Sequence, residues 1–256
     1  MLFEQKKVLI TVKAYPNPSR KYVETVCCAG IDLNTNQWLR LYPIPFRLLK
    51  DNKRFKKYSI IEVECHRAID DKRPESYKVN ADSINVLEVI GTKDKWQQRK
   101  DIVMPTLQET MCQVCKLGIK KEKSLALIKP HDIDFEWQKA KPIEKEKQEG
   151  YKQLLFTHEK IEPIEYIPHD FYYIFKCREQ SCSGHRLQII DWEIKQAFRQ
   201  WRLRYKTEAL LLEKIKEKWL TVMCLKNTDP YFFVGNMHRF PKNFMVLGTF
   251  YPPISK

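Results

Sequence analysis

Glycine is scarce in this chain, with only seven among 256 residues. This shortage excludes collagen-like and glycine-rich low-complexity structure, and it argues against a glycine loop that cradles phosphates. The sequence also lacks a Walker motif, a dinucleotide-binding fingerprint, a serine nucleophile elbow and an HExxH pair. These absences favour a non-enzymatic role and leave a nuclease as the enzymatic alternative.

Long apolar runs are absent too, since no stretch approaches the ~20 residues that a membrane-spanning helix needs. The first residues carry Glu4 and an apolar run that stops at Lys13, without the features of a secretory signal. We therefore expect the eight cysteines to be thiols or metal ligands rather than disulfides, and the protein to be cytoplasmic.

Positive charge, by contrast, is in excess. The 46 Lys and Arg residues outnumber the 32 Asp and Glu residues, which gives a formal net charge of +14. This excess favours a polyanionic partner, with DNA or RNA first and an acidic membrane surface second. With 43% hydrophobic residues the chain is too apolar to be disordered, and its length suits one large domain or two small ones.

The first ninety residues have the pattern of a β-rich module. Apolar runs between polar turns predict five strands, at residues 8–14, 23–32, 37–41, 58–69 and 83–90. The second and third should form a hairpin, and a charged loop at residues 70–82 separates the last two. Five short strands suit a small barrel, so we expect an OB-like module over residues 1–104.

Helical signals begin in the second part, residues 105–256. Thr106 and Glu109 have the spacing of a capping box, and Gly118 marks the expected end of that helix. The charged segment 139–150 has the composition of a linker. Further strands are predicted at residues 124–129, 171–175, 231–235 and 244–250. The expected fold class is α+β, an OB-like barrel followed by an α+β module with one long amphipathic helix and a Cys/His zinc knuckle.

The knuckle is predicted from two short motifs, a C-x2-C pair and a later C-x4-C-x2-H group. Such spacings let sulfur atoms converge on one zinc ion, and Gly184 would let the backbone turn tightly beside it. Five candidates compete for four places: Cys112, Cys115, Cys177 and Cys182, with His185 as the substitute. We expect a closed, structural site. Two alternatives stay open, namely an iron–sulfur cluster and ordinary buried thiols.

The best indication of function is a basic helix predicted from Asp191 to Trp219. Its apolar face should hold Ile194, Phe198, Trp201, Tyr205, Leu212 and Trp219. Beside that face, a row of cations at helical spacing should point outward toward phosphates: Lys195, Arg199, Arg202 and Lys206. No acidic residue occurs between Glu193 and Glu208, whereas a merely solvated helix usually mixes the signs of its charges.

A second basic cluster precedes the fourth predicted strand and could line a groove with the helix. Its members are Arg47, Lys50, Lys53, Arg54, Lys56 and Lys57, of which we expect Arg54, Lys56 and Lys57 to contact nucleic acid. The alternative partner of these basic surfaces is an acidic protein, which would make the chain an adaptor.

The enzymatic alternative rests on Asp191, Glu193 and Lys195, which read D-x-E-x-K. In nucleases of the PD-(D/E)xK type, the acidic pair binds Mg²⁺ and the lysine helps to orient the attacking water. That chemistry needs the three side chains on one side of a strand. The competing interpretation makes Asp191 a helix N-cap and Glu193 a first-turn acid.

One hairpin resembles a known family. Cys28-Ala-Gly30-Ile-Asp32 followed by Trp38-Leu-Arg40-Leu-Tyr-Pro43 is similar to the C-x-A-G…W-x-R element of dual-OB-type domains in prokaryotic defence systems. The resemblance implies an OB-type barrel that engages nucleic acid, with Trp38, Tyr42 and Phe46 as stacking candidates. It also implies an accessory role in antiviral defence or in a mobile element.

Overall fold

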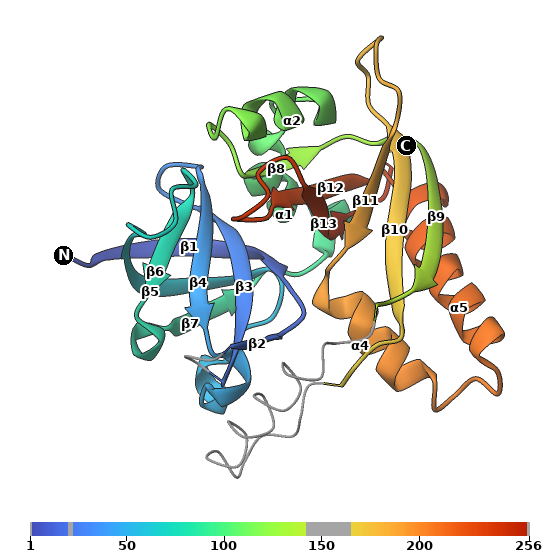
Figure 1. The fold of residues 1–256 in the computed structure, drawn as a ribbon. Coiled ribbons are helices and arrows are strands. Elements are labelled where there is room, and N and C mark those ends of the chain that lie inside the picture. Colours follow the sequence, from blue (N-terminus) through green and yellow to red (C-terminus); the bar gives the residue numbers. More distant parts are fainter. Residues whose placement is uncertain (1, 20–22, 142–164, 255–256) are drawn as a thin grey trace.

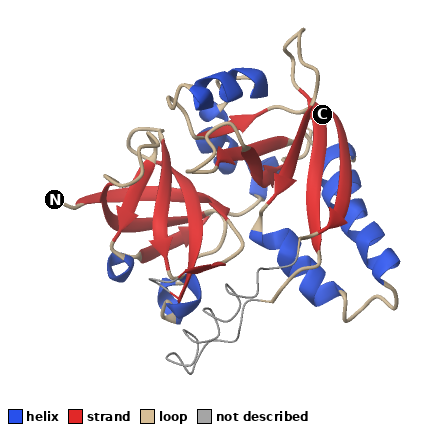
Figure 2. Cartoon of the chain, in the orientation of Figure 1, coloured by secondary structure: helices blue, strands red, loops and turns tan. Residues whose placement is uncertain are grey.

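The computed structural model describes residues 2–19, 23–141 and 165–254, so most of the linker-like segment 139–150 lies outside the described residues. Two β-sheets dominate the fold, and helices pack mainly around the second sheet (Figure 2). The fold is therefore mixed α+β, as the sequence predicts. None of the described helices is long and apolar enough to cross a membrane.

A closed five-stranded β-barrel forms the N-terminal part (Figure 1). Its strands follow the order β1-β3-β4-β6-β5, and β5 pairs back with β1. All neighbours are antiparallel except β4 and β6, which are parallel. Two further strands, β2 and β7, extend the sheet beside β3 and β5. The bounds are β1 Glu4–Lys13, β2 Asn17–Ser19, β3 Val23–Asp32, β4 Trp38–Ile44, β5 Ser59–Arg67, β6 Ser76–Val79 and β7 Asn85–Val89.

Strand β1 shows why the barrel adheres to the rest of the molecule. Val8 and Ile10 point into the barrel core, whereas Leu9 and Val12 join a second core outside the barrel wall. Alternate side chains of a strand point to opposite faces, and a register shift between Ile10 and Val12 puts Val12 on the outer side. A strand buried on both faces is apolar at successive positions, as this strand is from Val8 to Ile10.

The second sheet has the order β8-β12-β13-β11-β10-β9. Its bounds are β8 Leu125–Ile128, β9 His131–Lys139, β10 His169–Lys176, β11 His185–Ile189, β12 Tyr231–Asn236 and β13 Phe244–Phe250. The helices α4 (Trp192–Trp201) and α5 (Glu208–Lys216) pack beside β9 to β11, and α5 continues into π-helical turns at Glu217–Leu225 (Figure 1). Buried aromatic side chains of β10 and β12 meet the apolar faces of these helices.

The predicted long helix is in fact two helices. Helix α4 ends at Trp201, and Thr207 caps a new helix by accepting a hydrogen bond from the backbone N–H of Leu210 at 3.2 Å. The chain folds back between them, which brings the rings of Trp201 and Trp219 to 6.1 Å. The prediction of one continuous helix was wrong because a good internal N-cap and this aromatic contact favour a helical hairpin.

The helix before β8 also begins later than predicted. Helix α2 (Met111–Ile119) has its capping box at Thr110 and Gln113, not at Thr106 and Glu109. Residues 104–106 form a short 3-10 turn after α1 (Lys93–Val103), a helix that the sequence analysis did not predict. This correction places Cys112 in the first turn of α2.

Candidate functional sites: a metal centre and a basic cleft

Three cysteines and one histidine converge beside α2. The ligand atoms of Cys112, Cys177, Cys182 and His185 all lie within 4.8 Å of one another. His185 Nε2 is 3.5 Å from Cys112 Sγ and 3.4 Å from Cys182 Sγ, and Cys112 Sγ is 3.5 Å from Cys177 Sγ. Among the described residues, this is the one group of three or more such side chains that could hold a metal ion.

The spacing of these atoms fits a tetrahedral ion. A zinc ion at about 2.3 Å from sulfur and about 2.0 Å from nitrogen separates neighbouring ligand atoms by roughly 3.5–3.8 Å. Hydrogen bonds from the Glu179 N–H, His185 and Cys112 lower the pKa of the Cys177 thiol, although burial opposes this shift. The group can therefore supply the thiolate that a metal ion requires.

The local structure of the β10–β11 hairpin sets up the group. Gly184 has a φ of +103°, which glycine adopts without strain, and it turns the chain so that His185 follows Cys182 into the cluster. The hairpin is also tied to α2, since Glu179 accepts a hydrogen bond from Thr110 Oγ1 at 3.1 Å and pairs with Lys116 at 2.9 Å. A metal ion here would join two segments that are far apart in the sequence.

Cys115, predicted as one of the four ligands, does not belong to the group. His185, predicted as the substitute, occupies the fourth position instead. The C-x2-C pair lies within α2, so Cys115 is about 4.5 Å further along the helix axis than Cys112. A knuckle needs a tight turn between its cysteines, whereas here the second cysteine packs against the hydrophobic core. The structure therefore assembles the whole C-x4-C-x2-H group with Cys112, but without Cys115, of the C-x2-C pair.

The basic row of α4 does not point outward, contrary to the prediction. Lys195 is only 9% exposed, and its Nζ donates to the carbonyl oxygen of His169 at 2.7 Å and lies 3.5 Å from Asp170 Oδ1. Burial lowers the pKa of this amine. Its position at the edge of the apolar face lets the long aliphatic stem pack inward.

The other three residues of the row do not form an outward-facing line of unpaired cations on the helix either. Arg199 and Arg202 both pair with Glu165, and the Arg199 Nε–Glu165 Oε2 distance is 2.6 Å. Lys206 is exposed but lies in the turn between α4 and α5, not on a helix. Sequence alone cannot show this, because Glu165 comes from a segment outside the helix.

The D-x-E-x-K residues likewise do not share one face. Asp191 is the N-cap of α4, and its Oδ1 accepts from the Glu193 N–H at 3.2 Å. Asp191 and Glu193 both face Lys57, whereas Lys195 turns to His169. The helical interpretation is therefore confirmed, and the arrangement required for a PD-(D/E)xK site does not form.

Lys57 and Asp191 instead lie in the wall of a cleft between the barrel and the second sheet. Lys57 Nζ is 3.0 Å from Asp191 Oδ2 and 3.4 Å from Glu193 Oε2, and Gly248 of β13 leaves room for the ammonium group. Burial raises the pKa of Asp191 to about 6 even though Lys57 favours its ionised form. In the sequence, Lys57 belongs to the predicted basic cluster and Asp191 to the D-x-E-x-K motif, 134 residues apart.

The cleft has a volume of about 420 Å³ and combines cations with aromatic rings. Lys13 Nζ lies 4.1 Å from the centre of the Phe46 ring and 4.7 Å from that of Trp192. Arg99 stacks on Tyr58 at 3.8 Å and on Trp96 at 4.8 Å, while its guanidinium donates to the Ile90 carbonyl. The residues that line the cleft are Lys13, Lys56, Lys57, Tyr58, Thr92, Trp96, Arg99, Asp191, Trp192, Glu193, Thr249 and Tyr251.

Backbone strain also lies at this cleft. Asp94, Lys95 and Trp96 have φ values of 48°, 53° and 68°, so the backbone is left-handed at three successive residues that are not glycine. Each such residue costs about 1–2 kcal/mol, and strain of this kind concentrates at functional sites. Trp96, the last of the three, lines the cleft. Lys13, Trp96 and Arg99 are not among the residues predicted from the sequence, although Lys13 is conspicuous as a lone cation ending an apolar strand.

The predicted basic cluster before β5 is split by the fold. Lys56 is exposed at the rim of the cleft, whereas Lys57 lies in its wall with a side chain that is 9% exposed. Arg54 pairs with Asp51 at 2.9 Å, and Arg47 pairs with Glu24 at 3.2 Å. Of the three residues expected to contact nucleic acid, Lys56 and Lys57 thus reach the cleft.

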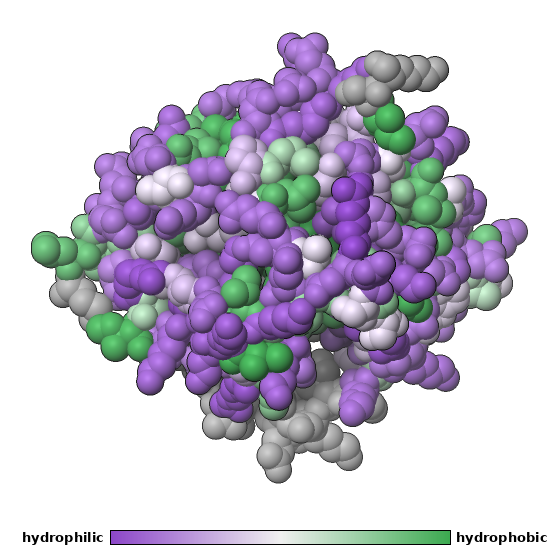
Figure 3. All heavy atoms as spheres, turned by 90° about the horizontal axis from the view of Figure 1, so that it is seen from above, coloured by the Kyte–Doolittle hydropathy of each residue, from purple (hydrophilic) through white to green (hydrophobic). Residues whose placement is uncertain are grey.

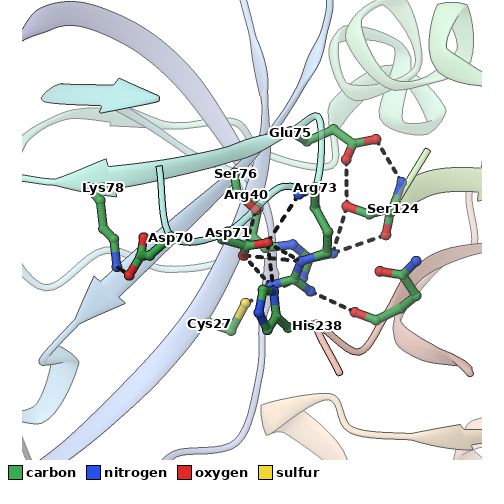
Figure 4. Close-up of polar contacts among 11 residues, drawn as sticks. Cys27, Arg40, Asp70, Asp71, Arg73, Glu75, Ser76, Lys78, Ser124 and His238 are labelled. Atoms are coloured by element: carbon green, nitrogen blue, oxygen red, sulfur yellow. Dashed lines mark hydrogen bonds and ion pairs between the residues drawn. The ribbon is translucent and has the colours of Figure 1, made fainter. Parts of the chain in front are cut away.

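The hairpin that resembles dual-OB-type domains has structural roles. Arg40 is buried, and its guanidinium donates to the Ser124 carbonyl at 3.0 Å, which joins the barrel to the second sheet (Figure 4). Trp38 packs edge-on against Phe233, and Phe46 is buried under Lys13. Of the three stacking candidates, only Tyr42 is exposed.

Two family models match consecutive parts of the chain. Residues 4–105 match a domain of unknown function, DUF8758, and residues 107–256 match a second domain of unknown function, DUF8757. No curated protein matches the chain. These descriptions name no ligand or activity, so the geometry of the sites carries the functional argument.

Proposed function

Because its residues 107–256 match that family model, the chain belongs to the DUF8757 family, and we propose that it binds single-stranded nucleic acid in the cleft between its barrel and its second sheet. The observation that carries this proposal is the wall of the cleft, where four cations and two carboxylates stand among aromatic rings. Proteins that bind single strands combine a positive groove for the backbone with rings on which bases stack.

The cations of the cleft have distinct tasks in this proposal. Lys56 is exposed and is free to contact a phosphate at the rim. Lys13 forms no ion pair with any residue that the structure describes and lies over two rings, so an incoming phosphate would give it an anionic partner. Lys57 is held by Asp191 and shapes the wall. The bases would stack on Trp96, which the strained turn presents to the cleft.

The barrel supports the proposal by its connectivity. A closed Greek-key barrel with the order β1-β3-β4-β6-β5 is the arrangement of OB-type domains, which bind oligonucleotides. The resemblance of the β3–β4 hairpin to dual-OB-type domains points in the same direction. An accessory role in prokaryotic defence or in a mobile element follows from that resemblance alone.

The Cys/His group is proposed to hold one structural zinc ion. All four tetrahedral positions are supplied by the protein, which suits a closed site rather than a catalytic one. Three sulfurs and one imidazole favour zinc over an iron–sulfur cluster, which usually takes four thiolates.

Fluorescence anisotropy with labelled DNA and RNA strands of about 16 nucleotides, over a series of salt concentrations, tests nucleic-acid binding. Lys56→Ala should weaken binding and reduce the salt slope by about one. Trp96→Ala should weaken it by about 1–3 kcal/mol with little change in slope, because it removes stacking rather than charge.

Lys139→Ala is the matched control, since Lys139 is an exposed lysine at the end of β9, the edge strand of the second sheet (Figure 1). The proposal fails if Lys139→Ala weakens binding as much as Lys56→Ala, or if neither DNA nor RNA binds. An acidic protein partner would be indicated if an acidic polypeptide binds and nucleic acid does not compete with it.

A further inference from the structure

A second pocket, of about 350 Å³, lies where three turns meet. They are the loop between β5 and β6 (residues 68–75), the turn between α2 and β8 (residues 120–124) and the turn between β12 and β13 (residues 237–243). This pocket shares no lining residue with the cleft. The molecular face shown in Figure 3 is largely hydrophilic, with only scattered apolar side chains.

A network centred on Asp71 fixes one side of the pocket (Figure 4). Asp71 accepts from Arg73 Nε at 3.0 Å, from Ser76 Oγ at 2.8 Å, and lies 3.0 Å from His238 Nδ1. Although burial acts against it, the Arg73 guanidinium holds the pKa of Asp71 well below its usual range. Arg73 also donates to the Asn236 carbonyl at 2.8 Å, which ties the β5–β6 loop to the end of β12.

A second network fixes the part of the pocket formed by the turn between α2 and β8. Glu75 accepts from the Ser124 N–H at 2.9 Å, and the buried Arg40 donates to the Ser124 carbonyl (Figure 4). The β5–β6 loop is therefore bound to both of the other segments. Such a pocket is held in shape before any ligand arrives, which reduces the entropy lost on binding.

The charge that remains available in the pocket is positive. Asp70, which lines the pocket, pairs with Lys78 at 2.8 Å, and Asp71, which lies beside the pocket, pairs with Arg73, so both aspartates are already compensated. Lys72, Lys121 and Arg239 are exposed and form no ion pair with any residue that the structure describes. Three cations without acidic partners at one pocket are suited to a phosphate group.

Asn236 adds a second, independent indication of a ligand. It lines the pocket, is 3% exposed, and its Nδ2 donates to the Pro241 carbonyl at 3.0 Å. Its Oδ1 is buried and accepts no hydrogen bond from the described part of the chain. A buried acceptor without a donor is costly, so a hydroxyl or amino group of a ligand would relieve that cost.

We propose that this pocket binds a small phosphate ester of mononucleotide size. Lys72, Lys121 and Arg239 hold the phosphate, and a hydroxyl or amino group of the ligand donates to Asn236 Oδ1. The volume lies at the lower end of the range of small-molecule sites, which suits a ligand of mononucleotide size. The site is independent of the proposed binding of nucleic acid in the cleft.

Isothermal titration calorimetry of the full chain tests the proposal with three probes: adenosine monophosphate, ribose 5-phosphate and orthophosphate. At least one ester should bind more tightly than orthophosphate, because only an ester can place its phosphate on the cations while a separate hydroxyl or amino group donates to Asn236 Oδ1. The double variant Lys121→Ala/Arg239→Ala should weaken ester binding by at least about tenfold, the usual effect of losing a charge-assisted contact.

The control is Lys139→Ala/Lys226→Ala, which removes two exposed lysines outside the pocket and lowers the net charge equally. If affinity falls equally in both double variants, the binding is general charge attraction and the proposal is overturned. So would the absence of ester binding to the wild-type chain. Oligonucleotide binding should be unchanged in Lys121→Ala/Arg239→Ala; a parallel loss there would make the pocket part of the nucleic-acid path instead.

Discussion

Lys57 joins the two halves of the chain through an ion pair that is almost removed from solvent. It comes from the barrel side, and its partner Asp191 begins helix α4 beside the second sheet. The attraction of Asp191 and Glu193 raises the pKa of Lys57 although burial opposes this. Buried pairs of this kind add little net stability, but removing one partner strands the other charge.

Lys57→Met should therefore lower the free energy of unfolding by about 3–5 kcal/mol at neutral pH. Burial already raises the pKa of Asp191 to about 6 from 3.8, and loss of Lys57 raises it further. An acid with a higher pKa in the folded chain favours folding when it is protonated. The cost of Lys57→Met should thus be full above the raised pKa and shrink as the pH falls toward 6 and below, as urea denaturation across this range would show.

Lys57→Met/Asp191→Asn supplies the control. The amide keeps the shape of Asp191 without its charge, so the pH dependence of the cost should disappear in the double variant. A cost for Lys57→Met that stays constant with pH would show that Asp191 is not the group left uncompensated.

At the scale of elements, the Cys/His group brings helix α2 together with the β10–β11 hairpin. His185→Ala should remove the ion, and Cys115→Ser on the same helix should keep it, since Cys115 lies outside the group. If free zinc exceeds its dissociation constant about a thousandfold, losing the ion lowers the free energy of unfolding by about 4 kcal/mol. Elemental analysis with thermal melting, with and without a chelator, measures both effects.

Wild-type chain should carry one zinc ion and show no visible absorption. Bound iron together with visible absorption would show that the group holds an iron–sulfur cluster instead of zinc. Metal lost from Cys115→Ser but retained in His185→Ala would restore the ligand set that the sequence spacing favoured and contradict the structural one.

Local signals were enough to predict most of the strands and the C-x4-C-x2-H half of the centre, because they depend on neighbouring residues. The short strand β6, which closes the barrel, was missed because Ser76–Val79 lies in a charged loop and owes its pairing to β4 and β5. The prediction of an outward-facing basic row on α4 was wrong for the same reason, because its partners lie outside the helix. Its arginines pair with Glu165, and Lys195 donates to the carbonyl of His169 and lies near Asp170. None of these partners follows from helical periodicity.

At the scale of the whole molecule, one apolar core belongs to both sheets. Leu9 and Ile31 of the barrel pack in the same cluster as Phe233, Leu247 and Phe250 of the second sheet. This cluster lies behind the cleft, so the proposed nucleic-acid site depends on the two sheets staying together. The division into residues 1–104 and 105–256 remains a prediction, and this shared core argues that the two parts unfold as one unit.

Phe250→Ala tests that coupling directly. Phe250 is fully buried, and its ring lies 5.7 Å from that of Trp96 and 6.2 Å from that of Phe233. The substitution should cost about 3–5 kcal/mol, because it opens a cavity between the sheets. Hydrogen exchange should then show the amides of β3 and β10 losing protection together, as expected for one cooperative unit. Barrel amides that stay protected while those of β10 exchange would instead reveal two units that fold separately, and the cleft between them would open without unfolding either one.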